Sequence, residues 1–126
     1  MAVHEDGTVL AFGTPGGDQQ DQWSLEFFLA HAVVGLGLQA AIDAPMFHTD
    51  SFPSSFYPRE MTPGDLVVED RLGSDVIDAL AARGHDVVRA GDWMLGRLCG
   101  VSRDPETGLL GAGANPRSNQ GYACGR

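Results

Sequence analysis

Gly13-Thr14-Pro15-Gly16-Gly17-Asp18 is the stretch around which the rest of the chain is organised. A β-rich run at residues 8–12 precedes it, and a segment with helical periodicity follows it from Gln19. This order predicts a strand, a tight glycine-rich turn and the start of a helix. In such a turn backbone N–H groups point outward, and the helix dipole favours negative charge. The turn can therefore hold an anion, or a carbonyl oxygen that becomes an oxyanion.

The alternative interpretation is a turn that needs glycine only for its dihedral angles, and the residues alone favour that alternative. A phosphate-binding loop is disfavoured, because no Gly-Lys-Ser/Thr follows the turn. Thr14 is neither N-terminal nor next to a base in the sequence. We therefore interpret its hydroxyl as a hydrogen-bonding group of the turn and not as a nucleophile.

The composition predicts one globular domain over residues 1–126. The chain has 126 residues, 43% of them hydrophobic and 20% charged, which is enough for a modest core. Its net charge of −9 disfavours nonspecific binding to nucleic acid or to an anionic membrane. No stretch reaches the ~20 apolar residues of a membrane helix. Residues 1–6 lack the features of a signal peptide, so the chain would stay in the cytoplasm if it is complete as given.

No metal or other cofactor is expected. Cys99 and Cys124 lack metal-ligand spacing and are too few for a disulfide scaffold. We expect two buried thiols, with a single bridge between them as the alternative. His48 with Asp50 could form a metal pair or a base, but no third ligand is evident, and a structural polar contact is favoured.

Strand and helix patterns alternate along the chain, with hairpins at both ends. The predicted fold is therefore α/β or α+β, with helices packed on a largely antiparallel sheet. The expected elements are a hairpin over 1–12, helices over 19–36, 38–44 and 74–83, extended residues 46–48, and strands over 65–69, 85–89, 96–102 and 109–114. Residues 50–64, rich in proline and aromatic residues, are expected to form an ordered loop.

The helix predicted after the turn carries a broad apolar stripe. Its apolar residues recur at helical spacing from Trp23 to Leu38, which predicts a helix covered on more than one side. Asp18 is expected to cap this helix, and Asp21 and Glu26 to face solvent near its start. Elsewhere, Arg117 is expected to pin a terminal turn by pairing with an acid.

Four segments in order resemble the C-terminal part of the γ-glutamyltranspeptidase family. They are Phe12-Gly13-Thr14-Pro15-Gly16-Gly17-Asp18, Ala41-Ile42-Asp43-Ala44-Pro45-x-Phe47-His48, Leu80-Ala81-Ala82-Arg83-Gly84-His85-Asp86-Val87, and Gly113-Ala114-Asn115-Pro116-Arg117 continuing to Gly121-Tyr122-Ala123. Each segment alone is a weak signal, but four in the same order are a strong one. The resemblance covers essentially the whole chain.

The resemblance implies an N-terminal-nucleophile hydrolase with a four-layer αββα fold, of which this chain would form part. In that family a precursor cuts itself into two subunits, and the new N-terminal Thr of the small subunit attacks a γ-glutamyl amide. Water or an acceptor amine then takes the acyl group. The glycine pair of the turn supplies the oxyanion hole, and here that pair is Gly16 and Gly17.

The sequence departs from the family pattern because it begins only a dozen residues before the turn. The family's nucleophilic Thr and its substrate-binding Ser pair would lie upstream, and its large subunit is absent. We therefore expect the distal portion of a small subunit that carries an oxyanion hole and is inactive in isolation. The partners implied are a γ-glutamyl small molecule or peptide and the remainder of the enzyme. The loop at Ser51–Pro58 and Asp18 resemble a less studied branch of the family.

A second hypothesis from another class is a noncatalytic remnant or interaction module. It predicts exposed apolar surface where missing strands would pair, and therefore a partner or self-association.

Overall fold

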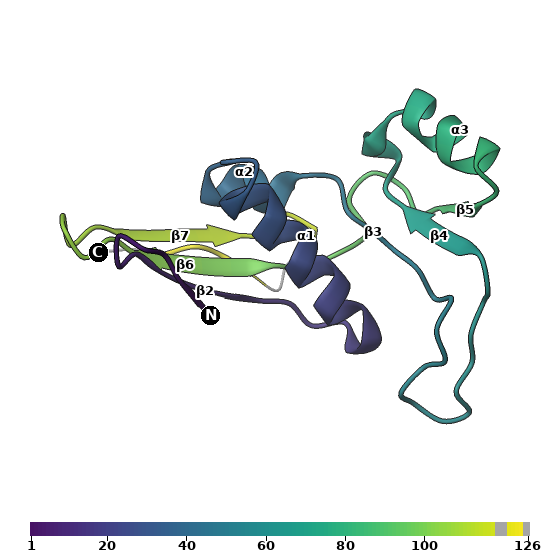
Figure 1. The fold of residues 1–126 in the computed structure, drawn as a ribbon, viewed down its shortest axis with the longest axis horizontal. Helices are drawn as coiled ribbons and strands as arrows, with labels where there is room; N and C mark the ends of the chain where they lie inside the picture. Colours follow the sequence, from purple (N-terminus) through teal and green to yellow (C-terminus); the bar gives the residue numbers. More distant parts are fainter. Residues whose placement is uncertain (118–120, 125–126) are drawn as a thin grey trace.

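The strand that leads into the glycine-rich turn lies inside a four-stranded sheet. The computed structural model describes residues 1–117 and 121–124, and Figure 1 shows the arrangement of its elements. In chain order these are β1 (Ala2–Val3), β2 (Val9–Gly13), the 3-10 helix η1 (Gly17–Gln19), α1 (Gln20–Ala32), α2 (Leu38–Asp43), β3 (Phe47–His48), β4 (Asp65–Val68), the 3-10 helix η2 (Asp70–Leu72), α3 (Ser74–Ala82), β5 (Asp86–Arg89), β6 (Cys99–Arg103) and β7 (Leu110–Ala114).

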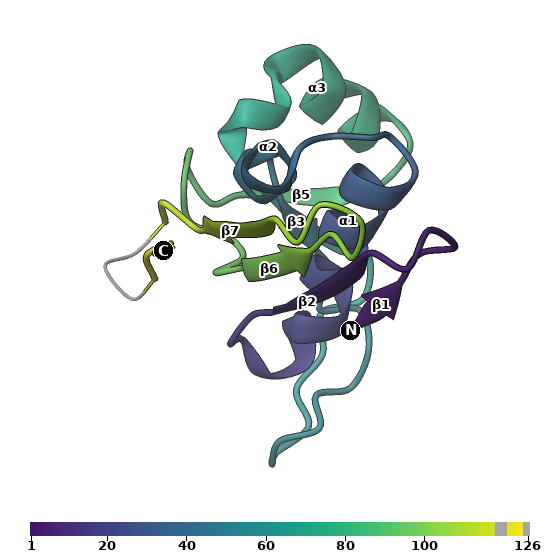
Figure 2. The same ribbon diagram turned by 90° about the vertical axis from the view of Figure 1, so that its left-hand side faces the viewer.

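The larger sheet has the strand order β1-β2-β6-β7, and all its pairs are antiparallel. The predicted N-terminal hairpin is confirmed, since Ala2 pairs with Leu10 and Val3 with Val9. β2 and β6 pair although they are distant in the sequence, with Leu10 opposite Ser102. Figure 2 shows β2, β6 and β7 side by side.

One face of this sheet packs on α1 and α2. Leu10 is 0% exposed and packs with Phe27 of α1 in the core. Two glycines allow α2 to approach closely. A Cβ on Gly100 would lie 3.3 Å from Leu38 Cδ1, and one on Gly113 would lie 2.8 Å from Ile42 Cδ1. The alternating residues of these strands point to the opposite face.

The smaller sheet has the order β3-β4-β5. β3 and β4 are antiparallel, whereas β4 and β5 are parallel with α3 between them along the chain. A parallel pair needs a crossover connection, and α3 supplies it. The largely antiparallel arrangement expected from the sequence therefore holds with one parallel pair as an exception.

The predicted helix over 19–36 is wrong at its C-terminal end, because α1 ends at Ala32. The sheet packs on one side of it, and Phe47 and Thr49 contact a second side through Glu26 and Gln22, but part of the predicted apolar stripe is open among the described residues. Trp23 and Phe27 are buried, but Leu29 is 44% exposed and Val33 and Val34 are more than 70% exposed. The physical reason is that no described element packs over the side of the helix that carries Leu25, Leu29 and Val33. In α3, Ile77 is buried, whereas Val76 is 47% exposed.

A buried carboxylate directly after β4 ties several loops together. The Glu69 side chain is 0% exposed. Its oxygens accept hydrogen bonds from the N–H groups of Met46 at 3.2 Å, Met94 at 2.9 Å and Leu95 at 3.0 Å. A buried charge needs such partners because it has lost its hydration.

Two arginines neutralise this carboxylate. Arg117 donates from Nε to Glu69 Oε1 at 2.7 Å and from Nη2 to Oε2 at 3.0 Å. It also donates to the carbonyl oxygens of Ile42 and Ala44, both at 2.7 Å, at the end of α2. The guanidinium of Arg71 lies 3.3 Å from Glu69 and stacks on the Trp93 ring. The prediction that Arg117 pairs with an acid is confirmed, and the pair joins α2 to β4.

Candidate active site

The glycine-rich turn begins where β2 ends, at Gly13. Gly16 has φ 145° and ψ 10°, and Gly17 has φ 61°. Both positions lie in the region of positive φ that residues with a side chain rarely adopt. The chain then enters η1 and α1 without a break. The predicted order of strand, turn and helix is therefore observed, with a short 3-10 helix inserted before α1.

The amides of Gly16 and Gly17 are both available for a ligand. Neither N–H group donates a hydrogen bond to any residue that the structure describes, and both glycines are exposed. The carbonyl oxygen of Gly16, in contrast, accepts from the Gln19 N–H at 3.2 Å. Two adjacent N–H groups without partners at a helix start can serve as donors to an anionic oxygen.

Two aromatic rings lie against the glycine pair. A Cβ on Gly16 would lie 2.4 Å from Trp23 Cζ3, and a Cβ on Gly17 would lie 3.1 Å from Phe56 Cε2. Trp23 comes from α1 and is 8% exposed, so the prediction of a packing role is confirmed. Phe56 comes from the loop between β3 and β4 and is 63% exposed.

The loop over residues 49–62 is fastened to the turn through Asp18. The Asp18 carboxylate accepts hydrogen bonds from Ser54 Oγ at 2.7 Å, from Ser55 N at 2.9 Å and from Ser55 Oγ. These bonds, led by that of the Ser55 hydroxyl, lower the pKa of Asp18. The predicted helix-capping role of Asp18 is wrong, since neither η1 nor α1 has a side-chain cap. The carboxylate binds the loop instead.

Two glutamines, one at the end of η1 and one in α1, extend this attachment. Gln19 Nε2 donates to Asp50 Oδ1 at 2.7 Å. Gln22 accepts from the Thr49 N–H at 2.9 Å and donates to the Thr49 carbonyl oxygen at 3.0 Å. The expectation of an ordered loop is therefore met by contacts between residues about thirty positions apart. No periodic signal in the sequence could have paired them, because the contact depends on the fold.

Thr14 has the structural role expected for it. Its hydroxyl donates to the Pro15 carbonyl oxygen at 2.8 Å and accepts from the Arg97 N–H at 3.0 Å. It thereby joins the turn to the segment that leads into β6.

Glu26 of α1 does not face solvent as predicted. Its Oε2 accepts a hydrogen bond from the Phe47 N–H at 3.2 Å, next to β3. Burial raises the pKa of Glu26 to about 8, against the opposing effects of the Phe47 N–H and the Arg117 charge. The position of Glu26 near the start of the helix predicted an exposed side chain, but β3 covers this side chain.

His48 lies 3.6 Å from Asp50, so the structural polar contact favoured from the sequence is observed. Burial lowers the pKa of His48, which favours the neutral imidazole. Within residues 1–117 and 121–124 no three His, Cys, Asp or Glu side chains gather as metal ligands would.

Cys99 and Cys124 are unbridged and exposed, so their predicted burial is wrong. Both lie at the outer face of the sheet, which no helix or further sheet of the described residues covers.

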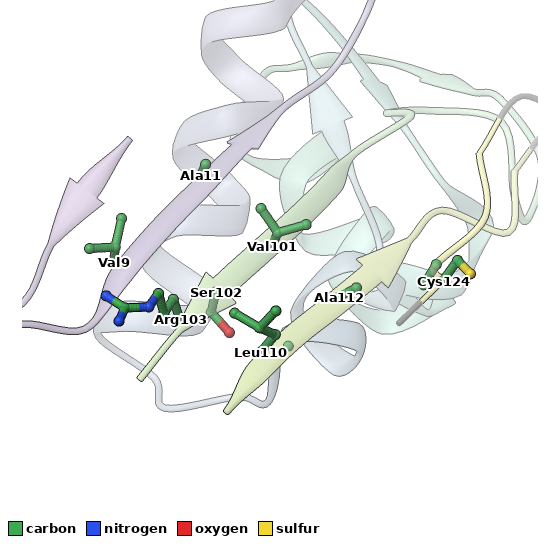
Figure 3. Close-up of a pocket in the computed structure, with 10 residues that line it drawn as sticks. Val9, Ala11, Val101, Ser102, Arg103, Leu110, Ala112 and Cys124 are labelled. Carbon is green, nitrogen blue, oxygen red and sulfur yellow. The ribbon is translucent and has the colours of Figure 1, made fainter. Parts of the chain in front are cut away.

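That outer face is apolar and hollowed. Figure 3 shows Val9, Ala11, Val101, Leu110 and Ala112 projecting from β2, β6 and β7 into a pocket of about 540 Å³. Val101 is 53% exposed and Leu110 is 73% exposed. This is the exposed apolar surface that the hypothesis of an interaction module predicts, and a missing part of an enzyme would leave the same surface.

No helix in the described part of the chain is long and apolar enough to cross a membrane.

A model of the γ-glutamyltranspeptidase family matches residues 1–125. The chain therefore belongs to the γ-glutamyltranspeptidase family of N-terminal-nucleophile hydrolases. It is similar to the oxamate amidohydrolase proenzyme of Klebsiella pneumoniae, with 31% identity over 95% of this chain and 22% of the relative. It is also similar to the glutathione hydrolase proenzyme of Bacillus subtilis, with 30% identity over 96% of this chain and 18% of the relative.

Among solved structures, that of LmbA2991 is 59% identical, with a TM-score of 0.89 over 94% of this chain and 21% of that chain. Solved γ-glutamyltranspeptidases that are 19–21% identical superpose with TM-scores of 0.73 to 0.74, which confirms the expected fold class. The chain spans 18–22% of the length of the two curated relatives described above.

Proposed function

We propose that residues 1–126 supply the oxyanion hole of a γ-glutamyltranspeptidase-like enzyme that cleaves γ-glutamyl amides. The observation that carries the proposal is the glycine pair itself. Gly16 and Gly17 are exposed, have positive φ angles, and keep their N–H groups without partners among the described residues. Trp23 and Phe56 support the two Cα atoms from two elements, so the donors are held in place before a ligand binds.

The chemistry that this turn would serve is acyl transfer through a tetrahedral intermediate. A Thr hydroxyl from an upstream segment of the enzyme adds to the amide carbonyl, and its proton passes to a base, for which the α-amine of that Thr is suited. The carbonyl oxygen becomes negative, and the N–H groups of Gly16 and Gly17 stabilise it. The C–N bond then breaks, and the leaving amine takes the proton. Water or an acceptor amine repeats the addition at the acyl-enzyme and regenerates the Thr hydroxyl.

The names of the relatives support amide cleavage as the reaction class. One is called an oxamate amidohydrolase and the other a glutathione hydrolase. The two names give different substrates, but both describe a hydrolysis. The γ-glutamyl group is our choice between these substrates. The upstream small-subunit segment and the large subunit are the partners this function requires.

Turnover of γ-glutamyl-p-nitroanilide by the full-length protein that contains this chain tests the proposal. Gly16→Ala and Gly17→Ala each place a methyl group against an aromatic ring and change the backbone that aims the N–H groups. The kcat of each variant is expected to be about 10²–10³-fold below that of wild type, which is the usual effect of losing an oxyanion donor.

Two control variants separate this effect from general damage. Gly13→Ala lies in the same segment, but its Cβ would meet nothing within 4 Å. Gly73→Ala imposes the same kind of backbone strain at φ 88°, with open space around it and in a distant loop. Both controls should keep kcat within about threefold of wild type. Equal losses in all four variants would refute the oxyanion hole at Gly16 and Gly17.

The isolated chain provides a second test. Residues 1–126 expressed alone should not hydrolyse γ-glutamyl-p-nitroanilide, because the proposed nucleophile belongs to another segment. Turnover by this chain alone would place a nucleophile within it and contradict the proposal.

A further inference from the structure

The loop over residues 49–62 brings an exposed aromatic ring to the glycine pair, and the proposed function gives that ring no role. Phe56 touches Gly17, since a Cβ on that glycine would lie 3.1 Å from the ring. Yet 63% of Phe56 is exposed. Trp23, on the other side of the pair, is only 8% exposed. The buried ring shapes the turn, whereas the exposed ring offers apolar surface to whatever binds at the amides.

The position of Phe56 is held by bonds from its immediate neighbours. Ser54 and Ser55 donate to the Asp18 carboxylate, and Asp18 directly follows Gly17. The Phe56 N–H donates to Ser54 Oγ at 3.1 Å. A ring fixed within one residue of these bonds keeps its place beside the amides when a ligand arrives, so its contact area is preorganised.

The charges around the loop limit which end of a ligand can face it. Four acidic side chains line the hollow between the loop and α1, and no basic side chain of the described chain lines it. They are Asp18, Asp21, Asp50 and Glu60. Asp18 directly follows Gly17, and the four acidic side chains outnumber Arg59, the loop cation that acts on Asp18. A carboxylate placed close to the scissile carbonyl on this side would therefore be repelled, whereas methylene groups would gain contact with the Phe56 ring.

We propose that Phe56 is a specificity-determining residue that selects acyl groups with methylene carbons next to the scissile carbonyl. Asp18 is the positioning residue that fixes the ring. This inference rests on the proposed oxyanion hole and adds the class of acyl group that the hole accepts. A γ-glutamyl group has such methylene carbons and can carry its charged end away from the loop. Oxamate has its carboxylate directly on the scissile carbonyl, so the loop disfavours it.

The test compares two substrates in the full-length protein that contains this chain. Wild type should show a kcat/KM for γ-glutamyl-p-nitroanilide at least tenfold above that for oxamate, measured by release of p-nitroaniline and of ammonia. Phe56→Ala should lower the γ-glutamyl value about tenfold, the usual effect of losing methylene contacts, and leave the oxamate value unchanged. Phe56→Leu, which keeps apolar surface, should recover most of the loss.

Phe52→Ala is the matched control, because Phe52 belongs to the same loop, is 76% exposed and is not among the side chains near Gly17. It should leave both values unchanged. Asp18→Asn should lower kcat/KM for the γ-glutamyl substrate less than Phe56→Ala does. The change in kcat should have the same direction in the two variants, and so should the change in KM. The midpoint of thermal unfolding of each variant, measured alongside, should stay at the wild-type value.

Two results would overturn the inference. In one, Phe56→Ala behaves as Phe52→Ala does. In the other, Phe56→Ala lowers kcat/KM equally for the two substrates and also lowers the midpoint of thermal unfolding. The ring would then be a structural support only. If either occurs while Gly16→Ala still loses 10²–10³ in kcat, the oxyanion hole stands and only the specificity role of Phe56 fails. If Gly16→Ala keeps its kcat, the proposed function itself fails.

Discussion

The Glu69 carboxylate joins four separate segments of the described chain, through Met46, Arg71, Met94 with Leu95, and Arg117. Glu69→Gln keeps the shape of the side chain but leaves the Arg117 guanidinium, which is 1% exposed, without its counter-charge. Breaking a buried pair from one side costs about 3–5 kcal/mol. We therefore expect a clear fall in the free energy of unfolding of the full-length protein, measured with urea.

The matched control is the ion pair between Arg89 and Asp70, whose N–O distance of 2.7 Å equals that between Arg117 and Glu69. Arg89 is 57% exposed, so solvent already screens the pair. Arg89→Gln should leave the unfolding curve almost unchanged. Equal effects of the two variants would mean that Glu69 and Arg117 contribute no more than a surface pair.

Glu26 gives the chain a dependence of stability on pH. Its pKa is raised from 4.5 to about 8 in the folded state, so the folded state prefers the protonated carboxyl. This stabilisation is complete below the unfolded pKa near 4.5 and is lost as pH rises toward 8. The loss is at most about 1.4 kcal/mol per pH unit. Glu26→Gln, always neutral, should flatten the profile of unfolding midpoint between pH 5 and pH 8, and parallel profiles would contradict the burial of this carboxyl.

The sequence predicted the turn at the glycine pair and the role of Arg117, but not the roles of Asp18 and Glu26. The positive φ angles of Gly16 and Gly17 follow from a glycine pair between a strand and a helix. The pairing of Arg117 with an acid was expected for a cation in a terminal turn, although no local pattern identified Glu69 as the acid. Asp18 and Glu26 were assigned from helix position alone, and both assignments are wrong because partners distant in the sequence reach these carboxylates.

At the scale of elements, the contact between α2 and β7 depends on a glycine. A Cβ on Gly113 would lie 2.8 Å from Ile42 Cδ1, and Ile42 is 0% exposed. Gly113→Ala therefore forces α2 outward, and overpacking of this kind costs about 1–3 kcal/mol. Gly13→Ala in β2 of the same sheet, where a Cβ would meet nothing within 4 Å, should cost much less. Comparison of the two thermal unfolding midpoints checks this, and equal midpoints would contradict the close packing.

The order of the elements was predictable because each carries its own period and turn residues. All the strands and helices expected from Val9 onward are present, with ends displaced by a few residues. The division into two sheets was not predictable, because it depends on which strands pair across long stretches of sequence. β2 pairs with β6, and β4 with β5, and no local pattern sets either choice.

At the scale of the whole molecule, the outer face of the larger sheet is expected to lie against the remainder of the enzyme. Leu110 is 73% exposed on that face, and its neighbour Leu109 is 69% exposed at the turn before β7. In the full-length protein Leu110→Glu should lower the unfolding midpoint by several degrees, because it buries a charge between two layers. Leu109→Glu should leave the midpoint unchanged, and equal midpoints in the two variants would mean that nothing covers this face.

That residues 1–126 form the distal portion of one larger domain stays a prediction. The sequence could give the family and the glycine pair, because both are carried by local residues. It could not give the surroundings of the pair, because Trp23 and Phe56 reach Gly16 and Gly17 only after the chain has folded. Those surroundings carry the inference about the acyl group.

The most direct measurement is a crystal structure of the full-length protein with a γ-glutamyl group covalently attached to its nucleophile. If these two glycines form the oxyanion hole, the acyl carbonyl oxygen lies about 2.7–3.1 Å from the amide nitrogens of both Gly16 and Gly17. An acyl oxygen that points away from both nitrogens and is bound by other donors would contradict an oxyanion hole at this pair.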